Sequence, residues 1–439
     1  MKKSTIIIAI VLGVTAISFA FYTTSEVAFT RSIDEGNRNQ LNYVNFNLVS
    51  PAPVMDSTES NLEFDKDIEK FLNRWDIKGA SVAVMKDNRL IYSKGYGVTN
   101  SETQEPVGTK HLFRIASASK LITAITIMKM VDDGIIDLEE NIFGEDGIFS
   151  HFDEMKDANH KKVKVKHLLN HKGGWSWRDG DFMFQATKIK RIMELEGPPS
   201  EDDIIEFVLK HRRLRYKPGT QYAYSNFGYM LLGKIIEHKT GSPYEDYVVN
   251  HILEPNGIYG MRISGNYEWE RRPFEVHYYN HPGAYKFQSF DGNYESVDKP
   301  YGGSDINTLG AAGAWIANAS QLTKLVALID PNNDFQLLSE KSRELMVSGN
   351  NYKDAYGWKG VKGENYWRTG TLAGSACFIQ RKDDGYSYAV ILNSSVWMGH
   401  RFNKYIKWMM DKAILELDNH QQNLFYQNHN SKSILPLTI

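Results

Sequence analysis

Cysteine is almost absent from this chain, since Cys377 is the one cysteine in 439 residues. The protein therefore cannot form an intramolecular disulfide or a zinc cluster of cysteines. Cys377 lies in the apolar run 376–379, where a small buried side chain is a more natural role than a reactive thiol. Excess charge is absent too: the formal net charge is -2, which gives no electrostatic basis for binding nucleic acid.

Two common catalytic signatures are also missing. The thirteen histidines form no His-Glu-x-x-His pair, which argues against a metallohydrolase, and we expect no metal or other cofactor. The Gly-x-Ser-x-Gly turn of α/β-hydrolases does not occur either, because the nearest match, residues 302–306, has Ile306 at its last position. The length and the 42% hydrophobic content are those of a globular protein with one large or two medium domains.

The N-terminus carries an export pattern. Lys2 and Lys3 precede an uncharged apolar stretch over residues 5–22, and residues 18–20, Ser-Phe-Ala, form a small-x-small cleavage site. The stretch is near the lower length limit for crossing a bilayer, so it also fits an uncleaved anchor, whereas a buried core helix would lack any polar face. We predict that residues 1–22 are a signal peptide or an N-terminal membrane anchor. The protein would then be periplasmic, secreted or tethered to the membrane.

The ordered body is predicted between residues 62 and 417. Residues 23–61 are polar and contain Ser-Pro-Ala-Pro, which is typical of a linker, and residues 418–439 form a polar tail. Strand patterns occur near both ends of the body, whereas residues 135–310 are mostly helical segments and loops. We therefore predict a mixed α/β (α+β) fold, with one sheet built from N- and C-terminal segments and a mostly helical insertion.

Residue periodicity predicts the individual elements. The predicted helices cover 65–75, 117–131 and 402–417, and the predicted strands cover 80–85, 89–96, 364–371, 376–380 and 386–393. Turn residues separate the paired strands at 87–88 and 383–385. Gly134 stands where a glycine commonly ends a helix.

The first element that carries chemistry is Ser117-Ala-Ser-Lys120, at the start of the long helix. Residues three apart share one face of a helix, so the Lys120 amine can reach the Ser117 hydroxyl, and the helix start adds partial positive charge. A serine hydroxyl needs an adjacent base, and a desolvated lysine beside other cations can be uncharged enough to serve. Ser-x-x-Lys recurs at residues 296–299, but no helical pattern exists there, and we exclude that copy.

The second element is Tyr224-Ser-Asn226, which follows a turn at 217–220 and precedes a helical run over 228–237. A tyrosine can relay a proton when neighbouring cations lower its pKa. The asparagine amide can orient the lysine and bind a substrate amide. Tyr-x-Asn by itself is a weak signal, because it recurs at Tyr43, Tyr278 and Tyr426.

The third element is Arg368-Thr369-Gly370, at the end of a predicted strand. A cation and a hydroxyl can hold a substrate carboxylate, and the glycine lets the strand edge approach the substrate closely. A backbone N–H just after it, with that of Ser117, would form an oxyanion hole. Lys-Thr-Gly also occurs at 239–241, but there it ends a helical run, where Lys and Gly are ordinary residues. We predict that this copy is not part of the site.

In this order, the three elements resemble those of the serine β-lactamase-like superfamily, which includes class C β-lactamases, D-alanyl-D-alanine carboxypeptidases, related esterases and D-aminopeptidases. The likeness covers about residues 68–417. Its supporting stretches are 78–84, 113–116, 165–171, 218–220, 252–255 and 312–314. The resemblance implies an antiparallel sheet flanked by helices, together with a mostly helical domain.

The resemblance also implies roles for the residues of the three elements. Ser117 would be the nucleophile, and Lys120 and Tyr224 would share the role of base. The substrate-binding residues would be Asn226, Arg368, Thr369, Gly370 and Thr371, with the N–H of Thr371 as the second oxyanion donor.

Two positions depart from the superfamily pattern. Lys or His usually stands where this chain has Arg368, and arginine keeps the charge but cannot act as a titrating base. The Glu-x-x-Leu-Asn loop of class A β-lactamases has Lys166 in place of its acidic residue here, so a class A enzyme is disfavoured. His167 and His171 flank that segment, and we interpret them as packing residues.

The sequence leaves the substrate open among a β-lactam, a peptidoglycan-like stem peptide, an ester and a D-amino-acid peptide, and it leaves the oligomeric state open. A different class is a non-catalytic relative that serves as a ligand sensor or scaffold, because a fold alone does not fix a function. All three elements are complete apart from the arginine. We therefore favour an exported serine hydrolase that acts through an acyl-enzyme.

Overall fold

The computed structural model describes residues 63–293, 295–348 and 353–430. The predicted signal segment or anchor, residues 1–22, and the linker, residues 23–61, lie outside the described residues. Within the part of the chain that is described, no helix is both long and apolar enough to cross a bilayer.

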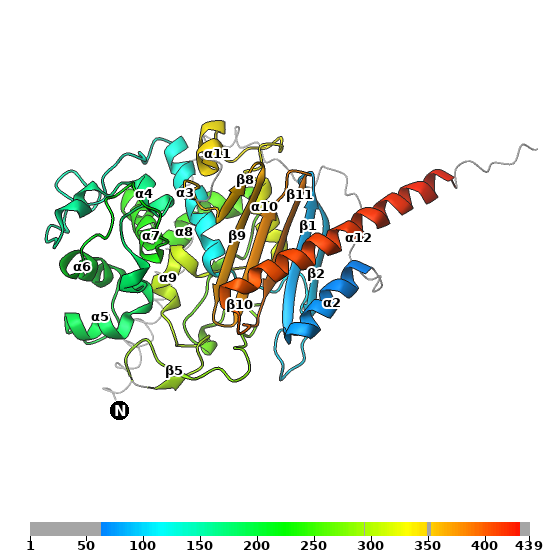
Figure 1. The fold of residues 1–439 in the computed structure, drawn as a ribbon, viewed down its shortest axis with the longest axis horizontal. Helices are drawn as coiled ribbons and strands as arrows, with labels where there is room; N and C mark the ends of the chain where they lie inside the picture. Colours follow the sequence, from blue (N-terminus) through cyan, green and yellow to red (C-terminus); the bar gives the residue numbers. More distant parts are fainter. Residues whose placement is uncertain (1–62, 294, 349–352, 431–439) are drawn as a thin grey trace, which may run out of the picture. The chain divides into compact units, whose positions relative to one another are not determined.

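A six-stranded sheet carries the first and the last strands of the body (Figure 1). Its order is β2-β1-β11-β10-β9-β8, and every neighbouring pair is antiparallel. The strands are β1 (Gly79–Lys86), β2 (Arg89–Gly97), β8 (Gly360–Lys362), β9 (Asn365–Leu372), β10 (Ser375–Arg381) and β11 (Tyr386–Leu392). N-terminal β1 pairs directly with C-terminal β11, with Ala80 opposite Leu392. The predicted sheet built from both ends of the chain is therefore confirmed.

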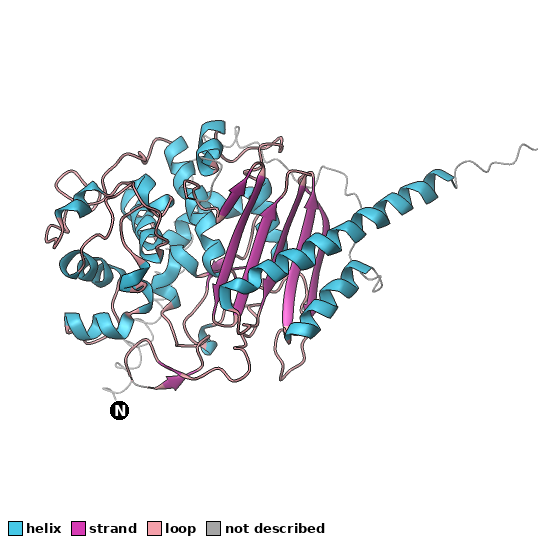
Figure 2. Ribbon diagram, in the orientation of Figure 1, coloured by secondary structure: helices cyan, strands magenta, loops and turns pink. Residues whose placement is uncertain are grey.

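Side chains along the central strands alternate between the two faces of the sheet, and both faces are covered. Helices α2 (Glu63–Trp75) and α12 (Asn403–Asn430) lie on one face (Figure 2), where they pack on residues such as Val82 and Phe378. Ala83 and Ile379 point to the opposite face and join the larger core. Cys377 lies in that core and is fully buried, and burial raises the pKa of its thiol. The predicted role as a small buried side chain is confirmed.

The helical part of the molecule lies between the two groups of strands in the sequence. Its helices, with those that link it to the sheet, are α3 (Ser119–Asp132), α4 (Val165–Leu169), α5 (Ala186–Met193), α6 (Glu201–His211), α7 (Asn226–Thr240), α8 (Tyr244–Val248), α9 (Ile306–Gly313), α10 (Ala319–Ala327) and α11 (Glu340–Met346). Short strands form two small sheets: β3 (Phe113–Arg114), β7 (Trp315–Ala317) and β4 (Arg262–Ile263) in one, β5 (Phe287–Gln288) and β6 (Ser296–Val297) in the other. These short pairs have too few residues to show a period of two in the sequence.

Two predicted element boundaries differ from the structure. Ser117 lies in a 3-10 turn, Ala116–Ala118, and α3 begins only at Ser119. The reason is the backbone of Ala116, whose φ of 48° lies in the left-handed region and cannot continue an α-helix. Helix α12 continues past the predicted end at residue 417, as far as Asn430, so part of the predicted polar tail is helical.

Candidate active site

The Ser117 turn is held between the small sheet and strand β9. Ile115 N donates to the carbonyl of Trp315 (3.0 Å), and Ala118 N donates to the carbonyl of Ile115 (3.1 Å). A left-handed, non-glycine residue such as Ala116 costs about 1–3 kcal/mol and persists where its surroundings enforce it, which happens often at functional sites. The hydroxyl of Tyr224 donates to Ser117 Oγ at 2.8 Å, so the predicted nucleophile and the predicted tyrosine are in direct contact.

Strand β9 approaches this turn closely because residue 370 is glycine. A Cβ at Gly370 would lie 2.0 Å from the carbonyl oxygen of Ile115 and 3.1 Å from Ala118 N. From the sequence, Gly370 is expected to let the strand approach the substrate; in the structure, the close approach is to the serine turn itself. A side chain of any size at residue 370 would push β9 away from Ser117.

Arg368 lies two residues before Gly370 on β9, so both residues point to the same face of the sheet. Its side chain is 1% exposed, and its Nε donates to the backbone carbonyl of Ser117 at 2.8 Å. The guanidinium therefore holds the backbone of the predicted nucleophile, which the sequence argument did not foresee. Its role as a carboxylate ligand stays a prediction.

Lys120 lies in the first turn of α3, behind Ser117, and its side chain is fully buried. Its Nζ donates to Asn226 Oδ1 (2.5 Å) and to the carbonyl of Ala312 (2.5 Å), and it lies 5.0 Å from the centroid of the Tyr224 ring. Burial is the main cause that holds the pKa of Lys120 well below its usual value, and the nearby charge of Arg368 acts in the same direction. A lowered pKa increases the fraction of the amine that is uncharged, which is the form that can accept a proton.

Asn226 begins helix α7, with Ser225 as its N-cap: Ser225 Oγ accepts from Gly228 N at 3.0 Å. Asn226 Nδ2 donates to Asp181 Oδ2 at 2.5 Å, while its Oδ1 faces the Lys120 amine. Asp181 thus fixes which way the Asn226 amide points. Sequence reasoning missed Asp181, whose one local signal is an N-cap: its Oδ1 accepts from Met183 N at 3.1 Å.

Two further residues around Tyr224 were not predicted to act there. Lys359 Nζ lies 5.3 Å from the centroid of the Tyr224 ring, and burial lowers its pKa, with Arg368 adding to the effect. The His171 ring packs 4.5 Å from that of Tyr224, and its Nδ1 accepts from Ser225 N at 3.2 Å. Burial holds the pKa of His171 well below its usual value. An uncharged ring packed on the tyrosine agrees with the packing role predicted for His171.

A cavity of about 920 Å³ opens in front of these groups. Predicted site residues that line it are Ser117, Tyr224, Asn226, Arg368, Thr369 and Thr371. Lys120 lies behind its wall. The described lining residues include four lysine or arginine residues, Lys359, Arg368, Lys404 and Lys407, of which Lys407 is paired with Asp411, and Asp181 is the one carboxylate. Because basic side chains outnumber carboxylates along its lining, the cavity favours a negatively charged substrate group.

The two rejected motif copies lie elsewhere. Ser296 belongs to strand β6 and is exposed, so the second Ser-x-x-Lys is not helical. Lys239 lies in the last turn of α7, where it pairs with Glu140 at 2.6 Å, and Gly241 ends that helix with a φ of 68°. The structure therefore confirms the predicted position of the Lys-Thr-Gly copy at a helix end.

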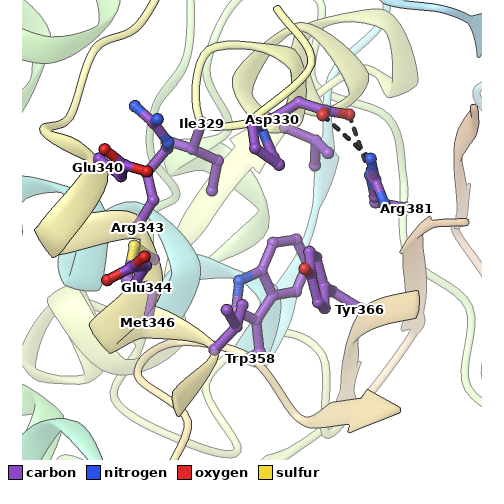
Figure 3. Close-up of a pocket in the computed structure, with 12 residues that line it drawn as sticks. Ile329, Asp330, Glu340, Arg343, Glu344, Met346, Trp358, Tyr366 and Arg381 are labelled. Atoms are coloured by element: carbon purple, nitrogen blue, oxygen red, sulfur yellow. Dashed lines mark hydrogen bonds and ion pairs between the residues drawn. The ribbon is translucent and has the colours of Figure 1, made fainter. Parts of the chain in front are cut away.

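A separate cavity of about 270 Å³ lies between α10, α11 and the β8–β9 edge of the sheet (Figure 3). Trp358 and Tyr366 line it, as does the buried ion pair of Arg381 with Asp330 (3.1 Å). The described side chains that line it include no serine, cysteine or histidine. It has no nucleophile or base comparable to those around Ser117.

Comparisons with known proteins agree with this fold. A family model described as Beta-lactamase matches residues 64–407. Protein flp of Staphylococcus aureus (strain N315) is 23% identical over 395 residues, which cover 81% of this chain and 76% of the relative. Penicillin-binding protein 4* of Bacillus subtilis is 26% identical over 210 residues, covering 48% of this chain and 42% of the relative.

Solved structures show the same fold at low identity. D-amino acid amidase from Ochrobactrum anthropi SV3, complexed with L-phenylalanine amide, is 22% identical and superposes with a TM-score of 0.62 over 82% of this chain and 99% of its own. The octameric penicillin-binding protein homologue from Pyrococcus abyssi is 24% identical, with a TM-score of 0.58 over 76% of this chain and 73% of its own.

Proposed function

This chain belongs to the Beta-lactamase family, and from this premise we propose that it is an exported serine hydrolase that forms an acyl-enzyme on Ser117. One observation carries the proposal: the Tyr224 hydroxyl donates to Ser117 Oγ at 2.8 Å, beside a buried lysine whose pKa burial holds well below its usual value. A nucleophile within hydrogen-bond reach of a proton relay, with a base behind it, is the arrangement that covalent catalysis by serine needs.

In the proposed acylation step, Tyr224 and Lys120 carry the proton of the Ser117 hydroxyl. An uncharged amine has two N–H groups and one lone pair. Both N–H groups are used by Asn226 Oδ1 and the carbonyl of Ala312, so the lone pair is left to take a proton. As Ser117 Oγ bonds to the substrate carbonyl carbon, its proton passes through Tyr224 to Lys120. The proton then returns through Tyr224 to the leaving nitrogen or oxygen as the C–N or C–O bond breaks.

Deacylation uses the same groups in reverse. A water molecule gives a proton to the Tyr224–Lys120 pair and attacks the ester carbon, and Ser117 Oγ leaves with a proton from that pair. The N–H groups of Ser117 and Thr371 stabilise the oxyanion in both halves of the reaction. Removal of one oxyanion donor typically costs about 10²- to 10³-fold in kcat.

The proposed substrate is a small molecule, or a peptide or peptidoglycan-like compound, with an amide, β-lactam or ester bond. The basic residues that line the cavity support a substrate with a carboxylate or another anionic group next to the bond that breaks. Export is proposed on the N-terminal pattern alone, with Lys2 and Lys3 before the apolar stretch 5–22. Cell fractionation with N-terminal sequencing tests it, and soluble cytoplasmic protein with an intact Met1 would contradict it.

The proposed chemistry is tested by covalent labelling of the purified protein with a fluorescent penicillin and a fluorophosphonate, together with hydrolysis of a panel of esters and amides. We expect labelling and turnover in the wild type and in Ser296→Ala, which changes the rejected motif copy. Ser117→Ala should lose both, with turnover reduced by several orders of magnitude. Wild-type protein that neither labels nor hydrolyses any member of the panel would refute the proposal.

A further inference from the structure

A second hollow adjoins the cavity around Ser117. Its volume is about 670 Å³, and it lies between the β9–β10 turn, the loop after β11 and the segment that leads into β5. Three residues, Phe184, Thr371 and Leu372, line both spaces. The cavity and the hollow are therefore adjacent, and a substrate that reacts at Ser117 and is long enough to pass these residues can extend from one into the other.

Large aromatic side chains stand exposed around this hollow. Tyr285 is 87% exposed and Trp397 is 74% exposed, and Phe184 and Phe287 are exposed beside them. Soluble proteins rarely gather large apolar side chains at one surface hollow unless something binds there. Aromatic rings bind other flat rings by offset stacking and edge-to-face contact. The walls therefore suit a ligand that carries a flat ring.

The charge of the hollow disfavours a cationic ligand. Lys299 lines it, and no carboxylate does so among the described residues. The Lys299 ammonium lies 4.4 Å from the centroid of the Phe287 ring, so a cation already occupies the face of that ring. Arg114 also lines the hollow, but its guanidinium is bonded to Ser264 Oγ and to the carbonyls of Gly265 and Pro300. Its role is structural.

The position of the hollow along β9 indicates which half of the substrate enters it. Under the proposed function, Arg368 and Thr369 bind the substrate carboxylate, which we place on the leaving portion, and the N–H of Thr371 holds the oxyanion. The strand continues from there to Leu372, where the hollow begins. Strand β8 pairs with β9 only over residues 365–367, and no other described strand pairs with that edge over 368–372. The acyl portion is therefore the part that reaches the hollow.

We infer that this hollow is an acyl-side subsite that binds a flat, ring-bearing acyl group, neutral or anionic. The inference rests on the proposed function, because it uses the positions of the nucleophile and the oxyanion donor. It adds a requirement on the substrate that the groups around Ser117 do not set: the ring must be separated from the reacting carbonyl by a spacer that follows the β9 edge.

The test uses two p-nitrophenyl esters with the same leaving group, the acetate and the 6-phenylhexanoate. We expect the wild type to prefer the 6-phenylhexanoate in kcat/KM. Trp397→Ala and Tyr285→Ala should each reduce the ratio of the two kcat/KM values by about 5- to 10-fold, the loss expected for one aromatic contact. Trp269→Ala is the matched control, since Trp269 is 80% exposed but lines neither space, and it should keep the wild-type ratio.

Charge gives an independent readout on the same variants. A carboxylate on the distal phenyl ring should preserve or raise kcat/KM, and an aminomethyl group there should lower it. An unchanged ratio in both Trp397→Ala and Tyr285→Ala, or an equal fall in Trp269→Ala, would overturn the subsite. Failure of the wild type to hydrolyse either ester in a Ser117-dependent manner would instead contradict the proposed function.

Discussion

Gly370→Ala is the sharpest single perturbation of the site, because the new methyl group meets backbone and not a movable side chain. The Cβ would lie 2.0 Å from the carbonyl oxygen of Ile115, and 3.1 Å from Ala118 N. Contacts of a real Cβ below 3.0 Å are essentially never seen. Strand β9 and the serine turn must therefore separate by about 1 Å in a close-packed region.

Two effects follow from that separation. Overpacking of this kind lowers the free energy of unfolding by about 1–3 kcal/mol. A displacement of about 1 Å between a nucleophile and its oxyanion donor lowers the rate by about 10²-fold. The expected signature is therefore a large loss of kcat and of the Ser117 acylation rate in a protein that is still folded.

The assay combines urea unfolding with pre-steady-state acylation of Ser117. Gly197→Ala is the matched control, since an added Cβ at Gly197 meets no atom within 4 Å, and neither stability nor rate should change appreciably. Neither Gly370 nor Gly197 has a positive φ, so backbone strain does not enter the comparison. A Gly370→Ala protein with wild-type acylation and stability would refute the argument that β9 must touch the serine turn.

Substitutions at four other residues test the groups around Ser117. Tyr224→Phe and Lys120→Ala should each slow acylation by about 10²- to 10⁴-fold, and the double variant should lose far less than the product because both residues act on one proton; multiplicative losses in stopped-flow acylation would contradict the shared role. The pKa of Lys120 is lower in the folded than in the unfolded state, so the folded state binds fewer protons. The free energy of unfolding of the wild type should therefore rise relative to that of Lys120→Met as pH rises toward about 10.4. Parallel stability–pH curves from urea unfolding would argue against a depressed pKa. The carboxylate of Asp181 raises the pKa of Lys120, so Asp181→Asn should lower kcat and move the acidic limb of kcat/KM to lower pH, whereas Asp179→Asn, at an exposed neighbour, should keep the wild-type pH profile; an unmoved limb in Asp181→Asn would limit Asp181 to packing. Arg368→Ala should lower kcat/KM for acidic substrates by the equivalent of about 1.5–3 kcal/mol more than for neutral esters, the scale of a charged hydrogen bond. Equal losses in kcat/KM for both substrate types would leave Arg368 only its contact with the Ser117 carbonyl.

Local patterns in the sequence were sufficient to predict most elements of the sheet and its flanking helices. Alternation and turn residues located the β1–β2 hairpin, where Asp87 and Asn88 have the positive φ values of 48° and 60° that a tight hairpin turn needs. The order of three short motifs then predicted the superfamily, and within it Ser117, Lys120 and Tyr224. These features depend on residues close together in the chain, so a single sequence records them directly.

Tertiary structure decided the contacts that join distant parts of the chain. Asp181 reaches Asn226 from 45 residues away, and Arg368 reaches the carbonyl of Ser117 from 251 residues away. No spacing in the sequence indicates either contact. Gly370 looked like a glycine that faces substrate, and only the packing of β9 on the Ser117 turn showed what it avoids. The physical reason is that close packing and buried electrostatics depend on which surfaces meet in three dimensions, whereas helical and strand periods depend on neighbours along the chain.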